Sequence, residues 1–225
     1  MQLFALFDLD NTLIARQAGL DAWARDFVRS RALPARAERL ITEALSERAY
    51  PSDFDWLRES LSLTEPVTEL WRLYVDGMSA VATCSPGVRS GLRKMREAGW
   101  TLGVVTNGAT DIQQAKIKRS GLRPLVDGVC VSDEAGSRKP SPGVFEAAAD
   151  RCGVQLSEGG WMIGDNAATD VEGGRAVGLQ TAWVAAGRRW PPTRRLPDMV
   201  VETAADAMTS LTEWGTDQRG YPGGS

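Results

Sequence analysis

Continuous apolar runs constrain the fold of this chain more than any other feature of its sequence. The clearest is LFALF at residues 3–7, and later runs include LGVV at 102–105 and WMI at 161–163. Apolar runs of about four to six residues, without alternating polar residues, are typical of strands buried on both faces of a parallel sheet. We therefore predict a parallel β-sheet. Its other strands are expected at 129–131 and 181–184, with a less apolar run at 199–201.

Helical segments lie between these runs, and each is followed by a glycine. In residues 86–98, Pro86 stands in the first turn, apolar residues recur on one face, and Gly99 follows the last turn. Proline at the start and glycine just after the end are typical of helix boundaries. Alternating strands and helices predict a doubly wound, Rossmann-like α/β fold. The other predicted helices are 109–120, 141–152 and 168–177.

Residues 15–83 interrupt this alternation. They contain no strand-like run, and their apolar residues recur at helical spacing between prolines at positions 34, 51 and 66. We predict about four helices here, which form a cap domain inserted after the first strand. The α/β core domain then comprises residues 1–14 and 84–214. Residues 215–225 lack apolar periodicity and are expected to be a disordered tail.

The absence of histidine limits the chemistry available to the chain. It excludes Ser-His and Cys-His nucleophiles, His-ligated zinc and phosphohistidine. The three cysteines show no C-x-x-C spacing, which argues against a disulfide framework and favours a cytoplasmic location. The formal charge of -3 argues against nucleic acid as a partner. No apolar stretch approaches the roughly 18 residues of a membrane span, so we expect no membrane association.

Polar residues follow four of the predicted strands directly or closely. Because ligands bind at the carboxyl ends of parallel strands, we expect these residues at one edge of the sheet. Several ionised carboxylates cannot crowd together without a cation. Oxygen ligands without histidine or thiolate favour Mg²⁺. In chain order, the residues are Asp8, Asp10, Thr106, Asn107, Lys139, Asp165 and Asp170.

Lys139 is also set apart by composition. All but four of the 26 basic residues are arginines; the other lysines are Lys94, Lys116 and Lys118. A chain that uses arginine for nearly every positive charge has a lysine here, which indicates a need for a compact point charge.

Together these residues resemble the four motifs of the haloacid dehalogenase superfamily, specifically its phosphatase branch. DLDNT at 8–12 is similar to the first motif, D-x-D-x-T, and Thr106 to the hydroxyl residue of the second. Lys139 before Pro140 is similar to the third. GDNAATD at 164–170 resembles the fourth, with one residue more between its acids than in G-D-x-x-x-D. The helical insertion after the first motif resembles the family's C1 cap.

The resemblance implies a Mg²⁺-dependent phosphomonoesterase for a small soluble metabolite, such as a sugar phosphate or a nucleotide. Asp8 would be the nucleophile that forms an aspartyl-phosphate, and Asp10 the general acid and then the general base. Mg²⁺ would be held by the Asp8 carboxylate, the Asp10 carbonyl and Asp165, with Asp170 acting through water or orienting the other ligands. The phosphoryl oxygens would be bound by Thr106, Asn107 and Lys139.

Several alternatives stay open. Asp10 favours phosphate-ester chemistry over dehalogenation, because a halide leaves without a proton. A phosphomutase, a 2-haloacid dehalogenase and a catalytically silent member that binds a ligand or a partner protein remain possible. Arg16 could reach a substrate anion or have a hinge or surface role, and the cap turn at 48–53 could select the substrate. The sequence does not predict the oligomeric state.

Overall fold

The computed structural model describes residues 2–219, with side chains described through residue 215. At its centre lies a parallel sheet with the strand order β3-β2-β1-β4-β5-β6. The predicted doubly wound α/β fold is thereby confirmed. The strands are β1 Phe4–Phe7, β2 Thr101–Thr106, β3 Gly128–Val131, β4 Trp161–Gly164, β5 Gln180–Val184 and β6 Met199–Val201.

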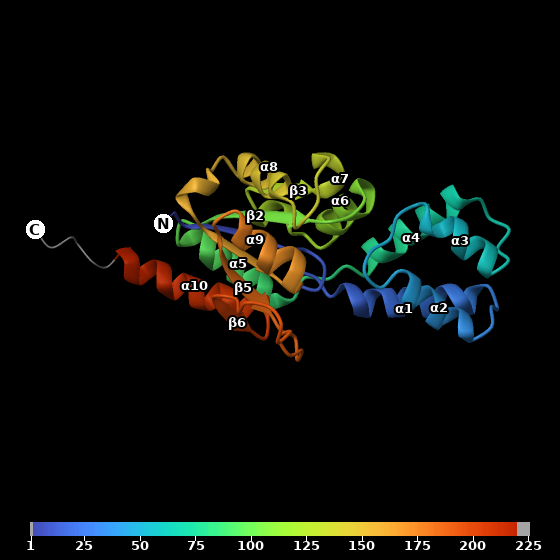
Figure 1. The fold of residues 1–225 in the computed structure, drawn as a ribbon. Coiled ribbons are helices and arrows are strands. Elements are labelled where there is room, and N and C mark those ends of the chain that lie inside the picture. The colour runs from blue at the N-terminus through green and yellow to red at the C-terminus, as the bar shows by residue number, and fades with distance from the viewer. Residues whose placement is uncertain (1, 220–225) are drawn as a thin grey trace, which may run out of the picture.

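Helices cover both faces of this sheet (Figure 1). Successive residues of β1 are all buried and alternate between the two faces: Ala5 and Phe7 join one apolar cluster, whereas Phe4 and Leu6 join the other. This arrangement explains why the strand is apolar throughout rather than at every second position. The covering helices are α5 Pro86–Glu97 and α10 Ala204–Arg219 on the first face and α8 Pro142–Cys152 on the second.

The insertion after β1 is helical. Figure 1 shows its helices grouped beside the sheet. Aromatic rings fill their interior, and Tyr74 stands edge-on to Trp23 with the ring centroids 5.0 Å apart. The same apolar cluster includes Ala109 and Ile112, which lie on the core side of the structure, so the insertion packs against the core. The helices are α1 Arg16–Ser30, α2 Arg36–Ala44, α3 Asp53–Ser60 and α4 Val67–Ala80.

The predicted domain division falls within connecting segments. The first predicted boundary, after residue 14, lies between β1 and α1, and the second boundary, before residue 84, lies between α4 and α5.

The remaining elements are α6 Thr110–Arg119, α7 Ser132–Ala135 and α9 Gly173–Ala176, together with the short helices η1 Arg123–Leu125, η2 Leu156–Glu158 and η3 Ala167–Glu172. No helix within residues 2–219 has the length and apolar character needed to cross a bilayer.

Two local expectations need correction. The helix predicted at 168–177 is η3, a π-helical turn, followed by the short α9. The helix α10 runs through Arg219 and so enters the segment 215–225 that was expected to be disordered. Because α10 is already formed and packed, it can extend by one hydrogen bond per residue without a new apolar face. Residues 220–225 of the expected tail lie outside the described part of the chain.

The strand order determines where a site can form. β1 lies between β2 and β4. After β1 the chain adds strands on one side of it, β2 and then β3, and later on the other side, from β4 to β6, so the carboxyl end of β1 is the switch point of the sheet. Phe7 of β1 pairs with Ile163 of β4, and the Asp8 amide donates to the Ile163 carbonyl at 2.9 Å. The loops that follow these two strands therefore lie side by side.

Candidate active site

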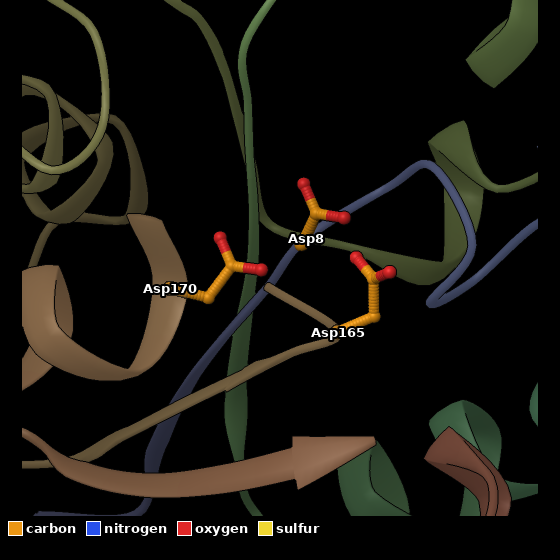
Figure 2. Close-up of side chains that lie close together, drawn as sticks. All are labelled: Asp8, Asp165 and Asp170. Carbon is orange, nitrogen blue, oxygen red and sulfur yellow. The ribbon is translucent and has the colours of Figure 1, made fainter. Parts of the chain in front are cut away.

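Three carboxylates meet at this edge of the sheet. Asp8 follows β1, Asp165 follows β4, and Asp170 lies in η3. One carboxylate oxygen from each lies within 4.8 Å of the others, and Figure 2 shows the three groups turned toward a common point. Asp8 and Asp170 are buried. The structure thus brings together three of the predicted metal ligands.

Asp170 is placed by the π-helical turn. The Asn166 side chain caps this turn by accepting hydrogen bonds from the amides of Ala168 and Thr169, at 2.9 and 3.1 Å. The Asp170 carboxylate in turn accepts from the Asn166 amide at 3.0 Å. A Cβ atom at Gly164 would collide with this carboxylate, so the close approach requires glycine. A π-helical turn takes up one residue more than an α-helical turn, which fits the longer spacing between the two acids.

Lys139 joins two of the carboxylates. Its Nζ atom lies 2.6 Å from Asp8 Oδ1 and 2.7 Å from Asp170 Oδ1, and the residue is only 2% exposed. Asn107 holds the Lys139 backbone from both sides: its Oδ1 accepts from the Lys139 amide at 2.9 Å, and its Nδ2 donates to the carbonyl at 3.0 Å. The Asn107 side chain is thus committed to Lys139, and the Asn107 carbonyl accepts from Gln113 Nε2 at 3.2 Å. Thr106 lies in the same cavity as both residues.

The carboxylates are not fully neutralised by the protein. Burial raises the pKa of Asp8 to about 8; Lys139 opposes this shift, and Asp170 and Asp165 add to it. Burial, with a contribution from Asp170, also raises the pKa of Asp165 to about 6, against the effect of Arg188. The pKa of Lys139 is raised because the two carboxylates outweigh its own burial. Hard oxygen donors with excess negative charge suit Mg²⁺, so the residues present fit that ion.

Arg188 is a site residue that sequence reasoning missed. Its Nη1 lies 3.1 Å from Asp165 Oδ2, and its Nη2 donates to the Asp165 carbonyl at 3.0 Å. Further bonds to the carbonyls of Val184 and Ala185 anchor the guanidinium to the end of β5. No sequence pattern distinguishes Arg188 from its neighbour Arg189, because the contact depends on the path of the loop.

Asp10 faces a different set of partners. Lys116 Nζ lies 2.9 Å from both of its carboxylate oxygens, and Gln113 Nε2 donates to Oδ2 at 3.1 Å. Arg16 Nε lies 3.8 Å from the same oxygen. Burial alone would raise the pKa of Asp10, but Lys116 and Arg16 outweigh it and lower that pKa. The Asp10 side chain is therefore outside the three-carboxylate cluster, and metal binding through its carbonyl stays a prediction.

Lys116 was not predicted as a site residue, although the composition contained a signal. The scarcity of lysine that set Lys139 apart applies equally to Lys116, and both lysines are buried against carboxylates of the first motif. Lys94 and Lys118 are exposed. The scarcity argument applied to all four lysines leaves four candidates, and only their burial in the structure reduces these to Lys116 and Lys139.

A cavity of about 220 Å³ contains the whole set. Its lining includes all the residues predicted from the strand ends, together with Arg16 and Arg138. The cap contributes residues 46–48 to its wall. Of the cap turn predicted to select the substrate, Arg48 reaches this cavity, whereas Asp53 accepts from the Tyr50 amide at 2.7 Å beside the start of α3. The seven predicted residues therefore share one concave site.

Comparison with known proteins gives this site a family context. The sequence model of the haloacid dehalogenase-like hydrolases matches residues 5–178, which include every residue of the site named from the strand ends. The match also contains the helical insertion, which lies between the first and second of these strands.

Three curated relatives are phosphatases or nucleotidases by name. Pyrimidine 5'-nucleotidase YjjG of Escherichia coli is 32% identical over 130 residues, 58% of this chain and 57% of the relative. Glyceraldehyde 3-phosphate phosphatase of Pyrococcus abyssi is 29% identical over 81% of each chain. Phosphoserine phosphatase of Thermus thermophilus is 35% identical over 52% of this chain and 46% of the relative. The chain thus matches only about half the length of the first and third.

Two solved structures are similar in fold to this chain over nearly its whole length. The HAD phosphatase from Thermococcus onnurineus is 25% identical with a TM-score of 0.68, covering 94% of this chain and 98% of that one. YfnB from Bacillus subtilis, bound to magnesium, has a TM-score of 0.73 at 21% identity, covering 93% of this chain and 98% of that one. The second likeness concerns the fold alone.

Proposed function

Because the chain belongs to the haloacid dehalogenase-like hydrolase family, we propose that it is a Mg²⁺-dependent phosphomonoesterase for a small phosphorylated metabolite. The single observation that carries this proposal is the position of Asp8. Its carboxylate lies in a cavity beside a buried lysine and two further carboxylates, and Asp10 lines the same cavity. In this proposal Asp8 is the nucleophile, Asp10 is the acid–base group and the carboxylate cluster is the place for a divalent cation, and all of them line one cavity.

In the proposed reaction, a carboxylate oxygen of Asp8 attacks phosphorus, and the bond from phosphorus to the ester oxygen breaks. Asp10, which must carry a proton at this step although Lys116 and Arg16 lower its pKa, gives that proton to the oxygen, so the alcohol leaves neutral. Asp10 then takes a proton from a water molecule, whose oxygen attacks the aspartyl-phosphate. The bond from phosphorus to Asp8 breaks, inorganic phosphate leaves, and both carboxylates return to their initial state.

The other residues of the site would balance the charge of the phosphoryl group and position the reacting groups. The Lys139 ammonium, held by Asn107, is placed to balance negative charge on the phosphoryl oxygens. Thr106 can donate its hydroxyl to a phosphoryl oxygen, since that hydroxyl presently accepts from Gln113 at 2.6 Å. Asp8, Asp165 and Asp170 would hold Mg²⁺, which when bound neutralises charge between nucleophile and phosphate. The cap wall at residues 46–48 would contact the leaving group and help to exclude water.

Phosphate release from a panel of sugar phosphates, nucleotides and phosphorylated hydroxy acids tests this proposal. We expect Mg²⁺-dependent hydrolysis of at least one small ester, with loss of activity in EDTA and recovery when Mg²⁺ is added back. Chloride release from 2-chloro acids, or transfer of phosphate between two hydroxyls of one sugar, would instead support one of the alternative reactions. A panel hydrolysed equally well with and without EDTA would contradict the metal requirement. The cytoplasmic location inferred from cysteine usage stays a prediction.

Mg²⁺ affinity is expected to increase with pH between about 6 and 8. In the metal-free protein, the pKa values of Asp165 and Asp8 are raised to about 6 and about 8, so at pH 6 Asp8 is protonated and Asp165 is partly protonated. Mg²⁺ binds the ionised carboxylates, and proton release therefore accompanies binding. Calorimetric titration at pH 6, 7 and 8 measures this, with a decrease in Kd of up to about tenfold per pH unit for each proton released. A Kd independent of pH would show that the carboxylates are already ionised.

A further inference from the structure

Lys116 and Gln113 contact the Asp10 carboxylate from one side, and Arg16 lies near it on another. The reaction proposed above gives these three residues no role. Lys116 contacts both carboxylate oxygens at 2.9 Å and also donates to Gln113 Oε1 at 2.9 Å. Gln113 donates to Asp10 and, with the same nitrogen, to Thr106 at 2.6 Å. These contacts come from α6, in a part of the chain about 100 residues after Asp10.

Burial makes this contact more than a surface ion pair. The Lys116 side chain is 3% exposed, and the Asp10 side chain is 19% exposed, with its open part in the cavity. An ammonium group loses much of its hydration at such a position and is tolerated only where hydrogen-bond acceptors replace the water. Lys116 finds three such acceptor atoms, two of which belong to Asp10. The carboxylate is therefore fixed from behind, while one side remains open to a substrate.

A second cation connects Asp10 to the cap. Arg16 donates to the carbonyls of Leu45 and Ser46, at 2.5 Å in each case, and its Nε lies 3.8 Å from Asp10 Oδ2. Arg16 is buried, and Ser46 forms part of the cavity wall. The loop of the cap that lines the site and the carboxylate of Asp10 are thus held by the same guanidinium.

We propose that Lys116 is a positioning residue that fixes the Asp10 carboxylate for proton transfer, and that Arg16 aligns the cap loop with it. This inference rests on the proposed function. Lys116 keeps its own proton throughout: the proton given to the ester oxygen comes from Asp10, and the proton lost by water returns to Asp10. Without Lys116, the carboxylate would remain in the site but in many orientations, and only steps that need its proton would slow.

The leaving group of the substrate separates this role from a structural one. An alkyl phosphate needs a proton on its departing oxygen, whereas p-nitrophenolate leaves readily without one. For Lys116→Met, we expect the single-turnover rate constant with a simple alkyl phosphate to decrease by about 100-fold. The rate constant of the pre-steady-state burst of p-nitrophenolate from p-nitrophenyl phosphate should change by less than about threefold. Equal losses with the two substrates would overturn the proposal.

Lys118→Met is the matched control. Lys118 lies on the same helix and is exposed, and its ammonium group has no hydrogen bond or ion pair among the described residues. We expect wild-type rate constants with both substrates for this variant. A decrease for the alkyl phosphate similar to that of Lys116→Met would show that loss of any positive charge on α6 suffices, and would overturn the specific role.

A double-mutant cycle tests whether Lys116 acts through Asp10. We expect Asp10→Asn to show the same dependence on the leaving group, and Lys116→Met to add no more than about twofold to it. Fully additive losses would contradict the proposal.

If Lys116→Met does not fold, Lys116→Gln keeps a hydrogen-bond donor without the charge and should show the same difference between substrates. A wild-type protein that hydrolyses neither ester would contradict the proposed function itself, rather than the role of Lys116.

Discussion

Asp8→Asn should reduce phosphate release by at least about 10⁴-fold, because the amide cannot act as the nucleophile that forms the aspartyl-phosphate. The variant should still fold, since asparagine has nearly the same volume and removes one charge from a crowded group of carboxylates. Phosphate release and intact-protein mass spectrometry after rapid acid quench measure both parts of this prediction. The wild type should show a phosphoryl adduct, and the variant should not.

Asp26→Asn is a suitable control for this substitution. Asp26 lies in α1 on the surface of the cap, where its side chain is 67% exposed and pairs with Arg29. We expect wild-type activity and the same adduct in this variant, because exposed ion pairs contribute little to stability. If Asp8→Asn hydrolysed esters at the wild-type rate, the aspartyl-phosphate mechanism would be wrong.

Lys139→Met is expected to affect both stability and activity. The ammonium lies between Asp8 and Asp170 and is buried, so its removal leaves two carboxylates without their shared counter-charge. Breaking a buried ion pair from one side costs about 3–5 kcal/mol of folding free energy. Loss of charge stabilisation at the phosphoryl group should lower kcat by about 10³-fold. Urea unfolding without metal and phosphate release with Mg²⁺ measure the two effects.

Mg²⁺ should restore part of the lost stability of Lys139→Met, because the ion binds the same carboxylates in the folded state. It should not restore activity, since the ammonium also acts on the phosphoryl oxygens. Lys94→Met, at an exposed position of α5, provides the comparison and should leave both quantities unchanged. Wild-type stability of Lys139→Met without metal would show that the buried carboxylates are protonated and need no counter-charge.

Local sequence patterns predicted the core elements well. The predicted strand at 161–163 is β4 Trp161–Gly164, and the predicted helix at 86–98 is α5 Pro86–Glu97. These predictions succeed because a buried strand must be apolar on both faces, and because proline and glycine act on their own backbone. The helix at 168–177 was predicted less accurately. Its π-helical start depends on Asn166 capping the turn and on Asp170 turning back toward Gly164, and neither contact has a periodic pattern.

The site also contains residues that the sequence could predict and residues that it could not. Asp8, Asp165 and Lys139 could be named from the sequence, because each follows a strand and parallel strands end at a common edge. Lys116 and Arg188 could not be placed in that manner. Lys116 reaches Asp10 from a helix face about 100 residues away in the chain, and Arg188 reaches Asp165 from a loop after β5. Helical periodicity shows that a position is on the buried side, but not which buried group it meets.

The sequence by itself determined the sheet, its helical insertion and the acids at the strand ends, because these follow from local periodicity and from the geometry of parallel strands. Only the tertiary structure decided which cation meets which carboxylate: Lys139 lies between Asp8 and Asp170, whereas Lys116 and Arg16 hold Asp10. The physical reason is that ion pairing acts through space over a few ångströms. Its partners are therefore set by how helices and loops pack, and that packing is not encoded in any short stretch of chain.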